Sequence, residues 1–231
     1  MKEKVSEFSR IRRVFADRSK SGKSSKYSWH TPHAGYRQSI KFRMFSKALK
    51  YSFDNNISNV KVLDIGCGTG GFLRQLIEWG GSPSHLTGVD FIDTRLEMAE
   101  KMSPSDVSWH LGTLNSKKEF NLVSAHTVFS SILDDSARQS LADQMWKQVC
   151  KDGWIMIFDF RYNNPSNPDV RKVTLKELKK WWPDDNHFIL IDMLAPPIAR
   201  YLVGKNYFFA ELLTMIFPFL RSHFVYLVQK K

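Results

Sequence analysis

The sequence predicts an α/β protein built on a doubly wound sheet of seven strands. Apolar runs and amphipathic helical patterns alternate from residue 60 to residue 193, as they do when helices cover both faces of a parallel sheet. The first predicted strand ends in a glycine-dense turn, and the second ends in an acid 24 residues beyond the first of those glycines. Turn and acid together indicate a ligand site at the carboxyl edge of the sheet.

Composition indicates one domain with appendages. A chain of 231 residues can bury one substantial core, and 42% hydrophobic with 25% charged residues is ordinary for a globular protein. Residues 1–18 lack the apolar core of a signal peptide, and no apolar stretch is continuous enough to span a bilayer, so we expect a cytoplasmic protein. Cys67 and Cys150 lack metal-ligand spacing, so both are expected to be reduced and no metal site is predicted.

The positive charge is concentrated at the N-terminus. The formal net charge is +11, and residues 1–50 hold 14 Lys and Arg against 3 Asp and Glu, so the remainder is neutral. Residues 1–26 are expected to form a basic flexible arm that ends in the linker-like segment 19–26. Such an arm either tracks the phosphates of nucleic acid, lipid head groups or a phosphorylated glycan, or is only a solvated tail.

Residues 27–54 are predicted to be a helical segment before the first strand. An aromatic and histidine-rich stretch precedes apolar side chains at helical spacing from Ile40 to Phe53. Lys41 and three further basic residues fall largely on the opposite side of this helix. The helix is expected to pack on the edge of the sheet.

The glycine-dense turn follows residues 60–65, a run typical of a strand buried on both faces. Gly66, Gly68 and Gly70 remove side chains where the backbone must turn and a ligand must approach, and the next helix presents free N–H groups. Glycine spacing alone also fits a dinucleotide site. Asp64 favours a cationic ligand instead, because a carboxylate there would repel a pyrophosphate.

The run from Asp64 to Gly70, Asp-Ile-Gly-Cys-Gly-Thr-Gly, resembles motif I of the class I S-adenosylmethionine (SAM)-dependent methyltransferases. The resemblance covers about residues 55–193 and 223–229, and it implies a Rossmann-like methyltransferase domain over residues 55–231 with an antiparallel seventh strand. In that family the glycine loop, which here includes Cys67, cradles the methionine moiety of SAM, and the motif acid organises its amino end.

The same resemblance extends to a lid over the site. The segment before motif I often folds over the cofactor in these enzymes, so residues 27–45 are expected to close over SAM and substrate. His33 is then a candidate substrate contact and a candidate base. A capping or surface role is the alternative for this histidine.

Two further positions match cofactor contacts of the family. Asp90 ends the second predicted strand, where a carboxylate accepts from both ribose hydroxyls, and Phe91 could pack on the adenine. Gly112 and Thr113 follow the third predicted strand, where many members carry an Asp that accepts from the adenine amino group. A threonine hydroxyl still accepts one hydrogen bond, so both residues remain candidate contacts.

Candidate catalytic and substrate residues follow the fourth and fifth predicted strands. His126 is the leading candidate base, because ligands of open α/β sheets bind beyond the carboxyl ends of the strands; it could instead only line the cofactor pocket. Asp159, Tyr162 and His33 rank behind it. The loop after the fifth strand also offers Arg161, Asn163 and Asn164 to substrate hydroxyls or an anionic group, with Asx-turns beside its prolines as the structural alternative.

Residues 194–221, between the sixth and seventh predicted strands, form an apolar helical insertion. The segment is too short and too broken to span a bilayer. It is expected to pack as a lid, to form a homodimer surface, or to rest as an amphipathic hairpin on the inner face of a membrane. The chain is accordingly expected to be a monomer or a homodimer.

The implied reaction is direct displacement, in which an acceptor nucleophile attacks the sulfonium methyl of SAM. The basic arm, the loop after the fifth strand and the insertion resemble small bacterial methyltransferases, some of which act on cell-surface glycans. We therefore expect methyl transfer to a hydroxyl of a glycan, a lipid-linked glycan or another anionic small molecule. RNA methylation guided by the arm, and a SAM-binding interaction module without turnover, are the alternatives.

Overall fold

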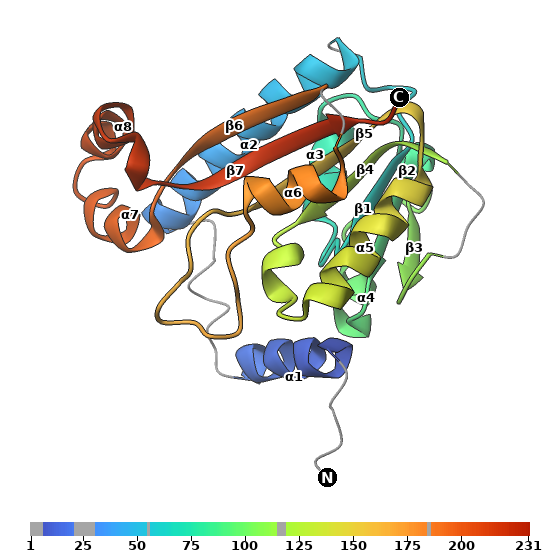
Figure 1. Cartoon of the computed structure of the whole chain (residues 1–231), viewed down its shortest axis with the longest axis horizontal. Coiled ribbons are helices and arrows are strands. Elements are labelled where there is room, and N and C mark those ends of the chain that lie inside the picture. Colours follow the sequence, from blue (N-terminus) through green and yellow to red (C-terminus); the bar gives the residue numbers. More distant parts are fainter. Residues whose placement is uncertain (1–6, 21–30, 55, 115–118, 184–185) are drawn as a thin grey trace.

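Seven strands form one mixed sheet in the order β3-β2-β1-β4-β5-β7-β6 (Figure 1). The structure, a computed structural model, describes residues 7–20, 31–54, 56–114, 119–183 and 186–231. Its strands are β1 (Val62–Ile65), β2 (Leu86–Asp90), β3 (Ser108–Leu111), β4 (Phe120–His126), β5 (Val149–Phe160), β6 (His187–Leu194) and β7 (Arg221–Gln229). Neighbours among β1 to β5 are parallel, whereas β7 is antiparallel to β5 and β6, so the expected fold is confirmed.

Helices cover both faces of this sheet (Figure 1). They are α1 (Glu7–Lys20), α2 (Pro32–Phe53), α3 (Gly71–Glu78), α4 (Asp93–Lys101), α5 (Asp135–Gln148), α6 (Leu175–Trp181), α7 (Pro196–Leu202) and α8 (Tyr207–Ile216), with short 3₁₀ turns η2 (Pro83–His85), η3 (Phe129–Ser131) and η4 (Pro218–Leu220). One apolar cluster joins α2 and α3 to the sheet, and a second joins α5 and α6 to its other face. The strand order reverses between β1 and β4, which is where open α/β sheets bind ligands.

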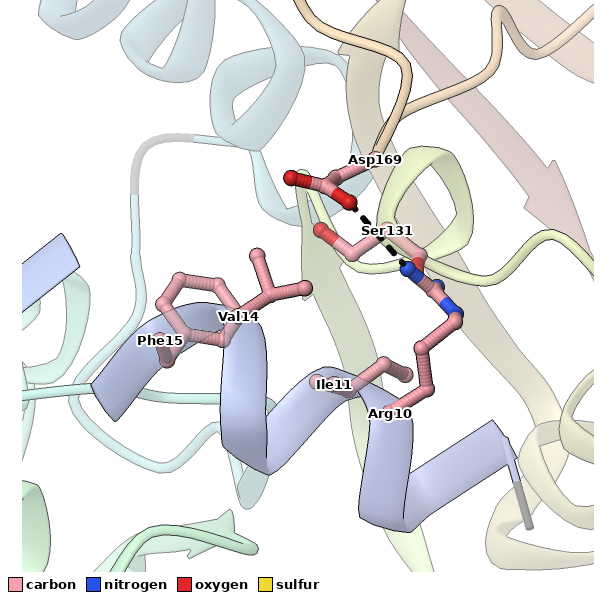
Figure 2. Close-up of a pocket in the computed structure, with 6 residues that line it drawn as sticks. All are labelled: Arg10, Ile11, Val14, Phe15, Ser131 and Asp169. Atoms are coloured by element: carbon pink, nitrogen blue, oxygen red, sulfur yellow. Dashed lines mark hydrogen bonds and ion pairs between the residues drawn. The ribbon is translucent and has the colours of Figure 1, made fainter. Parts of the chain in front are cut away.

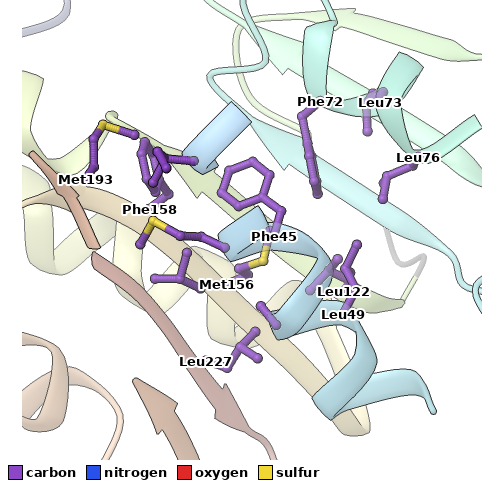
Figure 3. Close-up of a cluster of buried hydrophobic side chains, with 14 of the residues drawn as sticks. Phe45, Leu49, Phe72, Leu73, Leu76, Leu122, Met156, Phe158, Met193 and Leu227 are labelled. Carbon is purple, nitrogen blue, oxygen red and sulfur yellow. The ribbon is translucent and has the colours of Figure 1, made fainter. Parts of the chain in front are cut away.

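Helix α2 packs beside the edge strand β6 and its neighbour β7, as expected, but it reaches further into the core. Figure 3 shows Phe45 and Leu49 of α2 between side chains of α3 and of the central strands. The placement of Lys41 on the solvent side of the helix is wrong. Its Nζ lies 5.1 Å from the centroid of the Phe45 ring and 5.7 Å from that of Phe158. The contact between α2 and the sheet is wide enough to cover Lys41, which a simple amphipathic pattern would place in solvent.

The basic arm is ordered over its described part. Residues 7–20 form α1, which lies across the carboxyl edge of the sheet (Figure 1). Its apolar side chains recur at the i, i+3, i+4 spacing of a one-sided helix, and the Phe8 ring packs 4.6 Å from that of Phe91. A helix with one apolar face gains more from docking than from remaining in solvent. The rest of the predicted arm, residues 1–6 and 21–26, lies outside the described residues, as do residues 27–30 of the predicted lid.

The apolar insertion forms α7, α8 and η4. Helix α8 contacts β6 and η4, and its residues Ala210 and Thr214 are buried. In the parts of the chain that the structure describes, no helix has both the length and the apolarity needed to cross a membrane. Helices α7 and α8 together form a short helical hairpin at one end of the molecule (Figure 1).

Candidate functional site

The loop between β1 and α3 is shaped by glycines in left-handed conformations. Gly66, Gly68 and Gly70 have φ values of 67°, 57° and 75°. A Cβ atom at Gly66 would lie 2.5 Å from Val128 Cγ2, and one at Gly70 would lie 2.4 Å from Trp109 Cη2. Both the φ values and these close approaches require glycine, because a side chain would be strained and would collide. The loop is thus built to bring bare backbone to the carboxyl edge of the sheet.

Asp90 lies directly against this loop. Its Oδ2 accepts a hydrogen bond from Gly68 N–H at 2.8 Å, and its Oδ1 accepts one from Ile92 N–H at 2.9 Å. The carboxylate is 6% exposed and is therefore fixed at the tip of β2. Gly112 joins the same region, since its N–H donates to the Asp90 carbonyl at 2.8 Å, whereas Thr113 is exposed to solvent.

The buried acid of the glycine motif pairs with its neighbours on β4. Asp64 is 2% exposed, and Ser124 Oγ donates to its Oδ1 at 2.8 Å. His126 Nδ1 lies 3.8 Å from the same oxygen, which suits an ion pair with a protonated imidazole but is too long for a hydrogen bond. Burial raises the pKa of Asp64 to about 7, against the opposing effects of the Ser124 hydrogen bond and the Lys41 charge.

His126 occupies an aromatic box. Its ring lies 4.7 Å from the Phe45 centroid, 4.4 Å from Phe72 and 6.4 Å from Phe158. Its Nε2 is buried and forms no hydrogen bond within the described residues. Burial first, and the charge of Lys41 second, lower the pKa of His126 well below its usual value, so the ring is neutral at physiological pH. A neutral imidazole with an unused nitrogen can accept a proton from a bound group.

A cationic cluster that sequence reasoning missed lies beside this histidine. Burial lowers the pKa of Lys41 to about 8, although the charge of Asp64 opposes that shift. His223, at the start of β7, is fully buried and stacks on Phe158 with 5.2 Å between centroids. Burial first, then the charges of Arg37 and Lys41, lower the pKa of His223 to about 3. Arg37 and Lys41 are the cations of this cluster, and the neutral His223 shares their electrostatic environment next to Phe158.

Two sequence signals could have located this cluster. Arg37 and Lys41 precede the buried Phe45 by eight and four residues, so all three lie along one stripe of α2. An antiparallel last strand begins at the carboxyl edge, so its first residues, including His223, must lie near the ends of β4 and β5.

Asp159 and the candidate residues of the following loop hold the local backbone in place. Asp159 is fully buried, and its two oxygens accept from the N–H groups of Ser130 at 3.0 Å and Phe160 at 2.8 Å. Burial raises its pKa to about 6, with those hydrogen bonds opposing the shift. Tyr162 donates its hydroxyl to the Phe219 carbonyl at 3.0 Å, and the Arg161 guanidinium lies 4.9 Å from the Tyr162 ring.

One of the two asparagines of the loop fits the Asx-turn alternative, since Asn164 Oδ1 accepts from Ser166 N–H at 3.1 Å. Asn163 Oδ1 accepts from Lys172 N–H at 2.8 Å and so ties the two ends of the loop together. His33 lies in the first turn of α2, half-buried. Within the described residues, no group of three or more His, Cys, Asp and Glu side chains is placed to hold a metal ion.

Helix α1 covers the predicted adenosine end of the site. Arg12 Nε donates to the Phe91 carbonyl at 3.2 Å, and the Phe15 ring lies 4.2 Å from the Arg95 guanidinium. Figure 2 shows Arg10 reaching from the helix toward Ser131 and Asp169; it donates to the Ser131 carbonyl at 2.5 Å. Helix α1 thus bridges residues beyond β2 and β4, on either side of the glycine loop.

Comparison with known families and structures gives a consistent result. A family model described as a methyltransferase domain matches residues 56–195, more than half of the chain. No curated protein matches the chain. Residues 56–195 contain the glycine loop, Asp90 and His126, so the family match includes strands β1 to β6 but not β7.

Solved structures match most or all of the chain. Magnesium protoporphyrin IX methyltransferase from Synechocystis PCC 6803, with bound SAM, has a TM-score of 0.65 at 10% identity over 100% of both chains. The plantazolicin methyltransferase BpumL, in complex with S-adenosylhomocysteine, has a TM-score of 0.62 at 16% identity over 97% of this chain and 96% of its own. A SAM-dependent methyltransferase from Archaeoglobus fulgidus has a TM-score of 0.55 at 18% identity over 81% and 94%. These likenesses establish the fold.

Proposed function

The chain belongs to the methyltransferase domain family and is a SAM-dependent methyltransferase, and from this premise we propose that it methylates a hydroxyl of an anionic acceptor, either a glycan, a lipid-linked glycan or another small molecule. The dinucleotide alternative is set aside by the family match. The observation that carries the proposal is the neutral, buried His126, whose Nε2 has no partner in the described residues and whose Nδ1 faces Asp64.

The carboxyl edge fits the cofactor. The glycine loop offers bare backbone where a side chain would collide, and Asp90 holds a carboxylate beside that loop for the ribose hydroxyls. Asp64 lies at the end of β1, where a carboxylate suits the cationic amino end. When bound, SAM supplies an electrophilic methyl group on a leaving sulfonium, so the protein mainly has to align the acceptor and manage one proton.

His126 is proposed as the base for that proton. As the acceptor oxygen forms its bond to the methyl carbon, the methyl–sulfur bond breaks and the hydroxyl proton passes to Nε2. The resulting imidazolium lies 3.8 Å from Asp64, whose negative charge offsets it. Because the pKa of His126 is low before the reaction, its ring starts unprotonated. Asp64 supplies the negative charge that a buried imidazolium needs.

The cationic cluster supports an anionic acceptor. Lys41 and Arg37 act electrostatically on His223, and His223 Nε2 has no hydrogen-bond partner within the described residues. The positive potential of these two side chains attracts an anion. A carboxylate or phosphate on the acceptor would bind next to Phe158 and fix the hydroxyl close to His126.

The test is transfer of a labelled methyl group from SAM to separated polysaccharide, lipid and RNA fractions of cells. An ether formed on a hydroxyl survives mild alkali, whereas a methyl ester is hydrolysed, and mass spectrometry of the acid hydrolysate identifies a methylated sugar. Label that is stable to alkali in the polysaccharide or lipid fraction supports the proposal. Alkali-labile label, or label only in RNA, contradicts it.

A variant of Asp90 tests the cofactor site. SAM is titrated by calorimetry into the wild type and into Asp90→Ala, and the substitution is expected to weaken binding about tenfold to a hundredfold because a charged hydrogen-bonding partner is lost. Binding of SAM without transfer to any fraction would instead favour the interaction module without turnover.

A further inference from the structure

The α7–α8 hairpin and η4 expose an unusually large set of apolar side chains, here named the apolar corner. Four of them are at least 65% exposed: Tyr201, Phe208, Met215 and Phe219. The others are Tyr207, Phe209, Ile216 and Phe217. Isolated exposed apolar residues are ordinary, but a gathering of this kind on one hairpin marks an interaction surface.

The exposure is not the result of a loosely packed hairpin. The inner face of α8 is buried at Ala210 and Thr214, and Arg221 Nε donates to the Thr214 carbonyl at 2.9 Å. Tyr207 packs edge-on against Tyr36 of α2 at 5.1 Å, and its hydroxyl lies 3.0 Å from Ser39 Oγ. The hairpin is fixed to the body by one face, so its aromatic residues are held outward by the fold.

The charges around the corner have one sign. Arg200 and Lys205 lie within the hairpin, and Lys205 Nζ is 4.1 Å from the Tyr201 ring centroid. Glu211, the sole acid of residues 194–221, is turned toward α2 and pairs with Arg43 at 3.4 Å. Aromatic side chains bordered by Lys and Arg are typical of helices that lie in the interface of an anionic membrane.

The same charges disfavour a second copy as the occupant. A two-fold contact through the corner would place the same surface of each protomer against the other, so Arg200 and Lys205 of both protomers would lie in one interface. Like charges brought together in this way oppose association, whereas anionic head groups would attract them.

The corner adjoins the proposed acceptor site. Tyr162, in the loop after β5, donates its hydroxyl to Phe219, and Tyr207 packs on Tyr36, the residue before Arg37. Figure 1 shows α7 and α8 beside the beginning of α2, from which Arg37 and Lys41 arise. A partner docked on the apolar corner would therefore lie next to the proposed acceptor site.

We propose that the apolar corner docks the protein on an anionic lipid surface, so that the acceptor is a lipid-linked molecule presented at the head groups. This inference rests on the proposed function for the identity of the acceptor, but the docking itself does not. Tyr201, Phe208, Met215 and Phe219 enter the interface, and Arg200 and Lys205 contact the anionic head groups.

The test is flotation of the full chain with vesicles of phosphatidylcholine alone or mixed with phosphatidylglycerol. The wild-type protein is expected to float with the mixed vesicles, and Phe208→Ser combined with Met215→Ser is expected to reduce the bound fraction at least about tenfold. Reversing the charges with Arg200→Glu and Lys205→Glu should abolish the preference for phosphatidylglycerol. Met98→Ser combined with Met102→Ser removes two other apolar side chains that are more than half exposed, from α4 and its end, and is the matched control, expected to float as the wild type does.

The alternatives give different results. Failure of the wild type to float, or equal flotation of the Phe208 and Met215 variant, overturns the proposal. A dimer in light scattering that the same variant dissociates, without flotation of the wild type, identifies a second copy as the occupant and also overturns it. Titration of SAM reports that the variants are folded, and flotation of His126→Gln at wild-type level with loss of transfer shows that docking and catalysis fail independently.

Discussion

His126 Nδ1 lies 3.8 Å from Asp64 Oδ1, which joins the carboxyl ends of β4 and β1 at the point where the strand order reverses. The register of the two strands places Asp64 opposite Ser124, so His126 falls just beyond the paired residues. The proposed base and its proposed countercharge are thus positioned by adjacent strands of the sheet, and both lie beside the glycine loop.

Replacement of His126 should separate catalysis from cofactor binding. His126→Gln keeps a polar side chain in the aromatic box but cannot accept the proton, so kcat is expected to fall about 10²-fold to 10⁴-fold. The Kd for SAM, measured by calorimetry, is expected to remain near the wild-type value. His110→Gln, an exposed histidine of β3, is the control. An unchanged kcat in His126→Gln would exclude this residue as the base.

The raised pKa of Asp64 predicts a pH-dependent stability. A carboxyl group whose pKa is about 7 in the folded state and 3.8 as a free group binds more protons when folded over that interval. Stability contributed by this group is therefore present at low pH and is lost as pH rises from about 4 to 7. Asp64→Asn removes this cost of ionising the buried carboxyl group, so its free energy of unfolding should exceed that of the wild type by about 4 kcal/mol above pH 7 and by much less near pH 4.

Urea unfolding of both proteins at both pH values measures this difference, and the contribution of His223 is common to the two proteins. Asp106→Asn changes an exposed carboxylate and should show no such gain. A gain in Asp64→Asn that is the same at both pH values would mean that the folded carboxyl is not protonated.

The backbone features of the proposed cofactor half could be predicted from the sequence, whereas the basic cluster of the proposed acceptor half could not. The glycine loop and Asp90 occupy positions that the backbone itself dictates, because left-handed turns require glycine and a strand tip points to the carboxyl edge. The burial of Lys41 depends on how wide an arc of α2 is covered, and this is decided by the packing of the helix on β6 and β7. Helix α1 was not predicted because the basic composition of residues 1–26 is typical of a flexible arm, although apolar residues recur at helical spacing within it.

Lys41 is predicted to tune His126 and to bind the acceptor. Lys41→Met removes a positive charge that lowers the pKa of His126, so the acidic limb of the pH profile of kcat should shift to higher pH. The KM for an anionic acceptor should rise about tenfold, as expected for loss of one charged contact. Lys41→Arg should restore the KM in part. Lys47→Met, at an exposed position of the same helix, should leave the pH profile unchanged.

Helix α1 is predicted to slow the release of SAM. Its Phe8 and Phe15 side chains pack against Phe91 and Arg95, which lie directly beyond the strand that carries Asp90. Phe8→Ala combined with Phe15→Ala removes both contacts and should detach the helix, because a single short helix has little stability without its packing. The off-rate of SAM in stopped-flow measurements is expected to rise about tenfold while the on-rate changes little. Arg13→Ala, at an exposed position of α1, should have no effect, and an unchanged off-rate in the double variant would show that α1 does not retain the cofactor.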